Sequence, residues 1–446
     1  MDTAHQNAYR AYSLDALRRS PYWERLPRKF QESLSIVSMV LPFRTNRYVL
    51  DHLIDWDDLD QDPMFRMVFP QREMLKPEAY ERLRVLQGGC GNQEEIQRIV
   101  MRIRMDMNPH PAGQMTANVP TLEGRCLPGL QHKYKETVLY FPSAGQTCHA
   151  YCTFCFRWPQ FVGDPQLKIN SRDVLDLVTY LQARREVTDL LITGGDPMVM
   201  GSRQLGDLLD ALAAPGLAHL RNIRIGTKSI AYWPYKFIQE PEASQLLAAF
   251  RRATGRGQRI ALMAHFTHPR ELETDQVKTA MDALNSAGIT IRMQGPLLKG
   301  INDSPACWAR LWKLGVSAGA VPYYMFVERD TGPLDYFEVP LVRAWEIYRA
   351  AHNSVSGLAR TARGPSMSTQ NGKVVIDGVT TIGAQKAFAL RYVQARNPDW
   401  ALRPFHAKFK ETATWFDALQ PFSSEDEMYF QHKGGAVMNI RPIAVV

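Results

Sequence analysis

Short apolar runs recur through the middle of the chain, and a longer segment with helical spacing of apolar positions follows each of them. Short runs that end at polar or glycine residues are typical of buried strands, and the longer segments are typical of amphipathic helices. Strands that alternate with helices form parallel βαβ units, so the pattern predicts an α/β fold. The predicted strands are 137–141, 188–193, 221–225, 259–264, 289–293 and 321–327, and the predicted helices are 171–184, 202–213, 242–254, 272–287, 305–317 and 340–352.

Crossovers of one hand curl such a sheet towards a barrel, and the number of repeats, six instead of eight, predicts an open, partial (β/α)6 barrel. Polar or glycine residues follow each predicted strand, and ligands gather at this carboxyl edge of a parallel sheet. We therefore expect one cavity there. The predicted organisation is a helical N-terminal region over 1–115, the barrel over 116–355 and a C-terminal cap over 356–446.

Three cysteines lie close together after the first predicted strand. Cys148, Cys152 and Cys155 have C-x3-C-x2-C spacing, and no fourth cysteine lies near them. Three thiolates on one loop can bind three irons of a [4Fe–4S] cluster, whereas ferredoxin runs supply four. The open iron would then bind a small molecule. In radical chemistry this is S-adenosylmethionine (SAM), whose C–S bond breaks when it receives an electron.

A structural zinc site is the alternative for these cysteines. His149 would be its fourth ligand, but zinc sites usually use two ligand pairs, and side chains as close in sequence as Cys148 and His149 diverge. Cys90 and Cys126 have no close partner and are expected to be ordinary buried thiols.

The bulk composition excludes several classes of protein. The chain has 446 residues and a net charge of +8, with basic residues in short, scattered pairs rather than a stripe. This charge fits solvated helix faces and sites for anionic cofactors better than a nucleic-acid interface. No apolar run reaches the length of about 18 residues that a membrane span needs, and residues 1–17 lack the apolar core of a signal peptide. We expect a cytoplasmic protein, because oxidation would destroy the cysteine loop.

A second motif follows the next buried strand. Gly194, Gly195, Asp196 and Pro197 form a run that by itself would be only a turn. Glycines allow the backbone to approach a ligand closely. After a cluster motif and a strand, we expect the aspartate and the exposed amides to hold the amino group of SAM.

These motifs resemble the lysine 2,3-aminomutase family of radical SAM enzymes. The glycine run is similar to the GGE/GGD motif of radical SAM barrels, and the resemblance covers well over half of the chain, so it implies a radical SAM barrel. The matching segments, in order, are 128–134, the cysteine loop, 191–197, 225–227, 265–269, 296–303 and 322–324.

The resemblance implies a [4Fe–4S] cluster, SAM and pyridoxal phosphate (PLP). In this family a deoxyadenosyl radical removes a β hydrogen from an amino acid held on PLP, and the nitrogen then migrates to give a β-amino acid. It also implies an amino-acid-like substrate, a reductant protein such as flavodoxin or ferredoxin, and a possible homo-oligomer.

The family's cofactor residues carry over unevenly. Phe154 falls where an aromatic ring lies beside the adenine of SAM, and Arg157 falls where an arginine binds the substrate carboxylate. Lys133 replaces an arginine on the PLP side. The glycine-rich run before the PLP lysine is missing, but an ungapped match places Lys373 at the lysine. Lys373 either carries PLP or simply opens the strand that follows it.

The residues that bind the lysine side chain in the family are not kept in this sequence. The family's lysine enzymes grip the side-chain ammonium with two aspartates, and here Arg329 falls on the first, with Asp330 one residue later, and Ser366 on the second. One carboxylate at most remains, so we expect an amino acid other than plain lysine. If Arg329 faces the cavity, an anionic side chain becomes plausible.

Two other functions stay open at this point. One is a PLP-independent radical SAM epimerase, dehydratase or other hydrogen-abstracting enzyme, with Cys126 or Cys307 as a hydrogen donor for an epimerase. The other is a non-enzymatic iron–sulfur or zinc protein that binds a partner through its basic surface.

Overall fold

The computed structural model describes residues 9–90, 92–108, 118–163 and 168–431. Its centre is an eleven-stranded sheet in which the strands β5 to β15 follow one another in sequence order. The strands from β6 to β12 are parallel, while β5 and β13 to β15 pair antiparallel with their neighbours. The strands are β5 (Leu130–Tyr134), β6 (Thr137–Tyr140), β7 (Asp189–Ile192), β8 (Asn222–Thr227), β9 (Arg259–His265), β10 (Thr290–Leu297), β11 (Ala320–Val327), β12 (Arg363–Ser368), β13 (Gly372–Ile382), β14 (Gln385–Ala395) and β15 (Pro404–Lys408).

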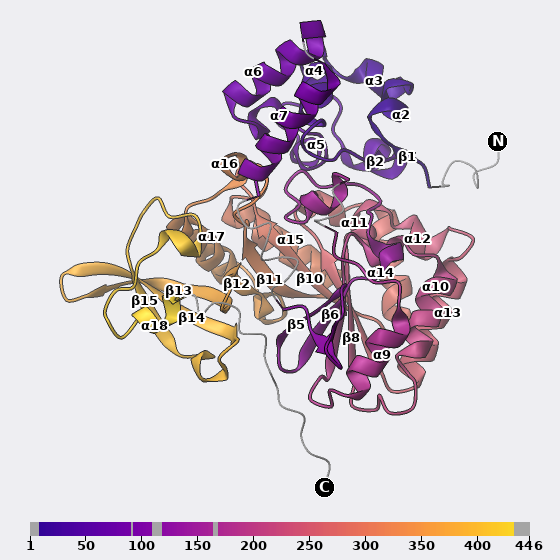
Figure 1. Ribbon diagram of the computed structural model, residues 1–446, viewed down its shortest axis with the longest axis vertical. Helices are drawn as coiled ribbons and strands as arrows, with labels where there is room; N and C mark the ends of the chain where they lie inside the picture. The colour runs from indigo at the N-terminus through magenta and orange to yellow at the C-terminus, as the bar shows by residue number, and fades with distance from the viewer. Residues whose placement is uncertain (1–8, 91, 109–117, 164–167, 432–446) are drawn as a thin grey trace.

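Each strand from β6 to β11 is followed by a helix that covers the outer face of the sheet (Figure 1), so the predicted partial (β/α)6 barrel is confirmed. Side-chain caps fix several helix starts, because Asp173, Thr274 and Ser304 accept hydrogen bonds from the first turn. The helices are α9 (Val174–Gln182), α10 (Ser202–Ala211), α13 (Ala243–Gly255), α14 (Asp275–Ser286), α15 (Pro305–Ser317) and α17 (Leu341–Asn353).

The inner face of the barrel is not sealed. Along β8, β10 and most of β11, fully buried residues alternate with partly exposed ones. Because side chains in a strand alternate between faces, the buried set packs on the helices and the other set lines open space. Arg224, Arg292 and Tyr323 belong to this inner set, so the lumen is lined by polar and cationic groups.

The region after α17 extends the same sheet. β12 is a further parallel strand that the sequence does not predict, and β13 and β14 form a long antiparallel pair beside it. A second apolar core, with Met367, Phe388, Tyr392 and Trp415 among its members, packs on the outer side of this extension. The expected cap therefore supplies strands that continue the wall of the barrel.

The two ends of the open wall come close together. Lys133, on the edge strand β5, donates a hydrogen bond of 2.6 Å from its Nζ to the carbonyl of Thr369, in the turn after β12. This contact joins segments 236 residues apart in the chain. It places the residues of β5 and β13 on one lumen.

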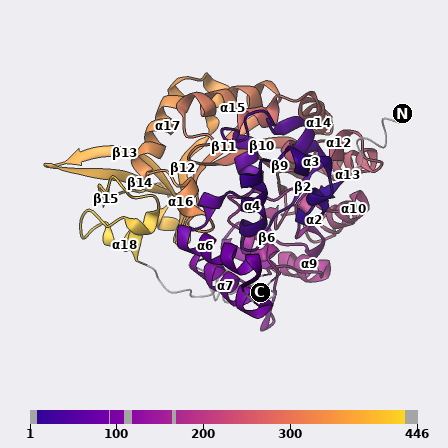
Figure 2. The same cartoon turned by 90° about the horizontal axis from the view of Figure 1, so that it is seen from above.

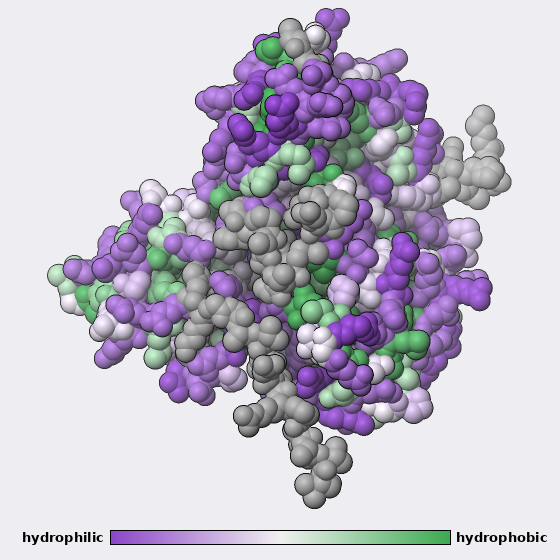
Figure 3. All heavy atoms as spheres, in the orientation of Figure 1, coloured by the Kyte–Doolittle hydropathy of each residue, from purple (hydrophilic) through white to green (hydrophobic). Residues whose placement is uncertain are grey.

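The N-terminal region forms a mainly helical layer across one end of the barrel (Figures 1 and 2). Figure 3 shows that hydrophilic residues cover most of this layer in that view. No helix in the described residues is both long and apolar enough to span a membrane. Its elements are β1 (Ala11–Tyr12), α2 (Leu14–Arg18), α3 (Pro21–Arg25), α4 (Arg28–Val37), β2 (Thr45–Asn46), α5 (Pro63–Val68), α6 (Pro77–Val85) and α7 (Gln93–Asp106).

Asp62 ties this layer to the barrel. Its fully buried carboxylate caps α5 through the backbone N–H groups of Met64 and Phe65. The same carboxylate forms an ion pair with Arg270, which follows β9. One side chain thus supports both a helix start and the contact between two regions.

We predict that Asp62→Ala lowers the free energy of unfolding by about 2–4 kcal/mol, because it removes a helix cap and leaves Arg270 without its partner. Urea denaturation of the apoprotein followed by circular dichroism measures this value. Asp60→Ala is the matched control, since Asp60 pairs with Lys29 on the surface and both side chains are more than half exposed. The control is expected to cost less than about 1 kcal/mol. Equal costs for the two variants would contradict the structural role of Asp62.

Candidate active site

The cysteine loop follows β6, and the N-terminal layer holds its backbone. The N–H of Tyr151 donates to the carbonyl of Arg44 at 2.9 Å, and the N–H of Thr153 donates to the carbonyl of Met67 at 2.9 Å. The Thr153 hydroxyl also donates to the carbonyl of Arg66 at 2.8 Å. These bonds fix the backbone on both sides of Cys152.

His149 is part of this support. Its Nδ1 lies 2.8 Å from the Ser229 hydroxyl, and its carbonyl accepts hydrogen bonds from Tyr9 and Asn46. Burial lowers the pKa of His149 to about 3, so the ring is neutral. A ring engaged with Ser229 holds the loop in place, and this is a different task from the fourth zinc ligand considered above.

The three cysteines are free thiols on this loop. Burial raises the pKa of Cys152 to about 12 and that of Cys155 to about 11. Cluster irons would bind them as thiolates, since metal coordination deprotonates a thiol. In the described residues, no group of three His, Cys, Asp or Glu side chains is arranged to hold a single metal ion. A cubane cluster does not need such a group, because each cysteine binds a different iron.

The glycine motif packs directly against the start of the cysteine loop. A Cβ atom on Gly194 would lie 2.1 Å from Nε2 of Gln146, and one on Gly195 would lie 2.4 Å from the carbonyl oxygen of Thr147. Gly194 also has a φ of 146°, which favours glycine. The N–H of Asp196 donates to the carbonyl of Thr147 at 2.7 Å. These glycines are required by contact between two loops of the protein itself.

The carboxylate of Asp196 is occupied by protein donors. It accepts hydrogen bonds from the N–H of Met198, the hydroxyls of Thr227 and Ser229, and the N–H of Lys228. Both oxygens are used, and the residue is 4% exposed. Asp196 therefore joins the carboxyl ends of β7 and β8, and this geometry leaves the backbone of the glycine run, rather than the carboxylate, to meet a ligand.

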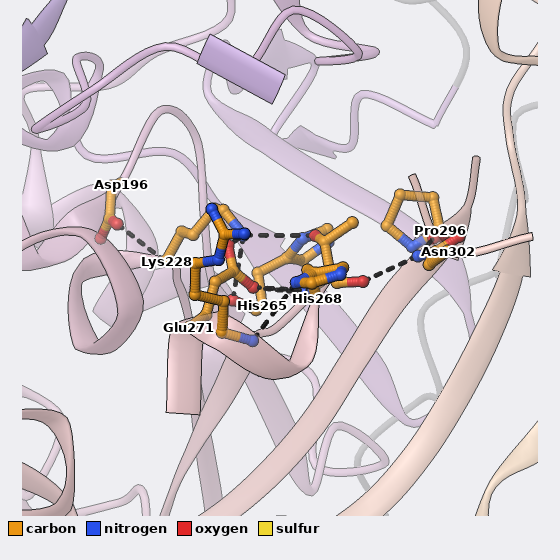
Figure 4. Close-up of polar contacts among 9 residues, drawn as sticks. Asp196, Lys228, His265, His268, Glu271, Pro296 and Asn302 are labelled. Atoms are coloured by element: carbon orange, nitrogen blue, oxygen red, sulfur yellow. Dashed lines mark hydrogen bonds and ion pairs between the residues drawn. The ribbon is translucent and has the colours of Figure 1, made fainter. Parts of the chain in front are cut away.

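Lys228 and Glu271 form a buried ion pair beside this point (Figure 4). The Lys228 ammonium lies 2.6 Å from Oε1 of Glu271, and Oε2 of Glu271 accepts the N–H groups of Thr267 and His268. Asn302 continues the network, because its amide donates to the carbonyls of Thr267 and Pro296. Side chains and backbone together thus lock the ends of β8, β9 and β10.

The two histidines of this region are neutral. Burial lowers the pKa of His265 to about 3 and that of His268 to about 4. Nδ1 of His268 accepts the N–H of Arg270, so this ring stabilises the turn after β9. His265, at the end of β9, is partly exposed, in agreement with a place in the wall of the cavity.

Two arginines meet at one aromatic ring near the cysteines. The guanidinium carbon of Arg157 lies 5.0 Å from the centre of the Phe156 ring, and that of Arg329 lies 5.5 Å from the same centre. Phe156 is 39% exposed although it directly follows Cys155, so the ring faces open space. The cysteine loop and the end of β11 therefore present both guanidiniums to one cavity.

Lys373 points into the same lumen from β13. Its Nζ lies 4.2 Å above the ring of Tyr324, and 5.6 Å from the ring of Phe326. Burial, together with the charges of Arg224 and Arg363, lowers the pKa of Lys373 to about 8. Lys373 thus lies at the second position of β13 and presents an easily deprotonated amine to the interior.

The sequence of this chain is similar to those of several known proteins. No family model matches the chain. A protein of Aquifex aeolicus named "Putative L-lysine 2,3-aminomutase" is 31% identical over 394 residues, which cover 88% of this chain and 92% of that protein. The L-lysine 2,3-aminomutase of Fusobacterium nucleatum is 29% identical over 52% of this chain and 51% of its own length.

The long match to the Aquifex protein decides the family. This chain belongs to the lysine 2,3-aminomutase family of radical SAM enzymes. Two solved structures are less similar. A radical SAM methyltransferase from Sphaerobacter thermophilus is 16% identical, with a TM-score of 0.37 over 52% of this chain and 68% of that chain. Streptococcus suis SuiB bound to S-adenosylmethionine is 14% identical, with a TM-score of 0.34 over 49% of this chain and 44% of that chain. Neither score carries an argument about function.

The aminomutase family residues fall into two groups in this structure. Arg157 and Arg329 meet at the ring of Phe156, while Lys133 and Lys373 lie on the side of β5 and β13. Asp330 lies beside Arg329 and raises its pKa, against the larger lowering by burial. Phe154 is buried and packs edge-on against the ring of Phe337 at 6.1 Å between centres.

Two expectations from the sequence concern cysteines outside the loop. Cys126 was expected to be buried, but it is exposed, because its two-residue strand β4 (Arg125–Cys126) belongs to a small hairpin outside the barrel. The side chain of Cys90 lies outside the described residues. Sequence reasoning also missed Arg44, whose guanidinium lies 5.1 Å from the Tyr151 ring centre, since nothing near it in the sequence signals a contact 107 residues away.

We predict that Gly195→Ala reduces the iron bound after anaerobic reconstitution, because its Cβ would displace Thr147 and the adjoining cysteine loop. The expected cost in unfolding free energy is about 1–3 kcal/mol. Gly206→Ala in α10 is the control, since its Cβ would make only ordinary contacts at 3.6 Å and a helical alanine is favoured. Iron and sulfide analysis tests this, and full iron content in Gly195→Ala would show that the close approach is dispensable.

Proposed function

We propose that the protein is an amino acid 2,3-aminomutase that uses Lys373 to carry PLP and acts on an amino acid other than lysine. Family membership supports radical SAM aminomutase chemistry, and the position of Lys373 carries the assignment of PLP. When bound, the cluster and SAM supply a 5′-deoxyadenosyl radical, and PLP supplies a carrier for the migrating amino nitrogen.

The residues of the lumen fit PLP in three respects. The Lys373 amine lies inside the barrel with its pKa lowered to about 8, and a lysine must be neutral to attack a carbonyl. The Ser366 hydroxyl is buried with no hydrogen-bond partner in the described residues, and its cross-strand pairing with Phe326 places it on the same face as Lys373. Lys133, across the lumen wall on β5, adds an amine that could bind a phosphate group.

The chain's own groups have separable tasks in this proposal. Arg157 would orient the substrate carboxylate through its planar fork of donors. The rings of Tyr324 and Phe326 beside Lys373 would help to exclude water from the radical, as such chemistry requires. The ends of β7, β8 and β9, tied by Asp196 and by the Lys228–Glu271 pair, would hold the two loops at a fixed separation.

The PLP-free alternative finds no supporting observation at the site. It assigned Cys126 or Cys307 as a hydrogen donor, but Cys126 is exposed on the hairpin. Cys307 lies in the first turn of α15, in the outer helical layer.

We expect borohydride reduction of the PLP-incubated protein to place a pyridoxyl group on Lys373, as mapped by mass spectrometry. At pH 7.5 a lysine of pKa about 8 is neutral in about a quarter of molecules, against about 0.1% for an ordinary lysine. Labelling should therefore rise from pH 6.5 and level off above about pH 8.5. Lys133 is the internal competitor, because burial lowers its pKa to about 7. A tag on Lys133 alone, or on no lysine, would contradict the role of Lys373.

We also expect Cys152→Ala to abolish reductive cleavage of SAM to 5′-deoxyadenosine, because it removes one iron ligand from the loop. Cys126→Ala serves as the matched control and should retain cleavage, since that thiol is exposed on the hairpin. The assay is chromatographic detection of 5′-deoxyadenosine after reduction with dithionite. Cleavage by Cys152→Ala at the wild-type rate would overturn the assignment of the cysteine loop.

A further inference from the structure

The space beside the cysteine loop holds more positive charge than the protein neutralises. Arg157 and Arg329 share the ring of Phe156, and neither forms an ion pair with any carboxylate in the described part of the chain. Arg157 also stacks on Phe141, with its guanidinium carbon 4.7 Å from the ring centre. Each guanidinium therefore rests on an aromatic face and keeps its N–H donors for another partner.

The two neighbouring acids do not cancel this charge, because Asp330 is a single carboxylate beside two guanidiniums and Glu328 is buried. Glu328 is 7% exposed, and burial raises its pKa well above the usual range, which favours the neutral form of this carboxyl. Lys133 adds a further amine, close enough for Arg329 and Lys373 to lower its pKa. A buried cation without a counter-ion is unfavourable, and a bound anion would relieve that cost.

The two guanidiniums come from different elements. Arg157 lies two residues after Cys155, and Arg329 lies two residues after the end of β11. Lys133 on β5 and Lys373 on β13 are close enough for the charge of Lys373 to lower the pKa of Lys133. A phosphate group would lie on this side of the lumen. Arg329 lies at the ring of Phe156 together with Arg157, the group that would hold the substrate's α-carboxylate.

We propose that the substrate is an amino acid with a carboxylate side chain, which Arg329 binds while Arg157 binds the α-carboxylate. This inference rests on the proposed function and adds the class of substrate. An arginine fork matches a carboxylate in two parallel hydrogen bonds. A lysine side chain would instead bring an ammonium towards Arg329 and Arg157, and like charges in a buried space repel.

Deuterium transfer tests the substrate class. The loaded enzyme is reduced with SAM and with β-deuterated L-aspartate, L-glutamate, L-asparagine, L-glutamine or L-lysine, and deuterium in 5′-deoxyadenosine is measured by mass spectrometry. We expect kcat/KM for one of the two acids to exceed that for its amide and for lysine at least 100-fold. Transfer from lysine or an amide at an equal or higher kcat/KM would overturn the proposal.

Arg329→Gln assigns the contact. It should lower kcat/KM for the preferred acid about 100-fold and leave the value for the amide within about threefold, and Arg329→Lys should recover part of the loss. Arg349→Gln, on the exposed face of α17, is the matched control and should leave both values unchanged. An equal loss for acid and amide in Arg329→Gln would show that Arg329 grips the α-carboxylate, and the proposal would be wrong.

Binding without turnover separates this inference from the proposed function. Isothermal titration of the same acid into the loaded but unreduced protein should give a Kd at least tenfold weaker in Arg329→Gln than in wild type. If no amino acid transfers deuterium but this difference is present, the aminomutase reaction is wrong and the anion site stands. If the difference is absent, the anion site is wrong whatever the outcome of the reaction.

Discussion

The position of the cysteine loop depends on backbone contacts from two sides. The N-terminal layer holds it through the carbonyls of Arg44 and Met67, and the glycine run after β7 meets it at a distance that leaves no room for a Cβ atom. Neither support is local in sequence, since the first lies about 100 residues before the loop and the second about 45 residues after it. The position of the loop in this protein therefore depends on packing between three separate segments.

Side-chain contacts also join the carboxyl ends of neighbouring strands beside the cysteine loop. Asp196 ties β7 to the turn after β8, and the pair formed by Lys228 with the fully buried Glu271 ties β8 to the turn after β9. Breaking a buried pair by removing one partner is strongly destabilising, so these charges hold geometry even where they add little net stability. Arg157 and Arg329, which form no ion pair within the described residues, meet at the ring of Phe156 beside the cysteine loop.

The sequence predicted the barrel well, because each of its strands is a short apolar run followed by an amphipathic helix, and such local patterns determine local structure. β12 was missed because its sequence, with Arg363, Gly364 and Pro365 at its start, has no apolar run and becomes a strand only beside β11. Cys148, Cys152 and Cys155 were found by spacing alone. The roles of Asp196 and Lys228 were not, since their partners are set by tertiary packing of strand ends.

We propose that the loop of Cys148, Cys152 and Cys155 holds a [4Fe–4S] cluster whose open iron binds SAM. Electron paramagnetic resonance of the anaerobically reconstituted, reduced protein tests it most directly, with spectra recorded before and after SAM is added. We expect a reduced [4Fe–4S] signal whose g-values shift on addition of SAM. A protein that takes up zinc in place of iron, or a cluster signal that SAM leaves unchanged, would contradict it.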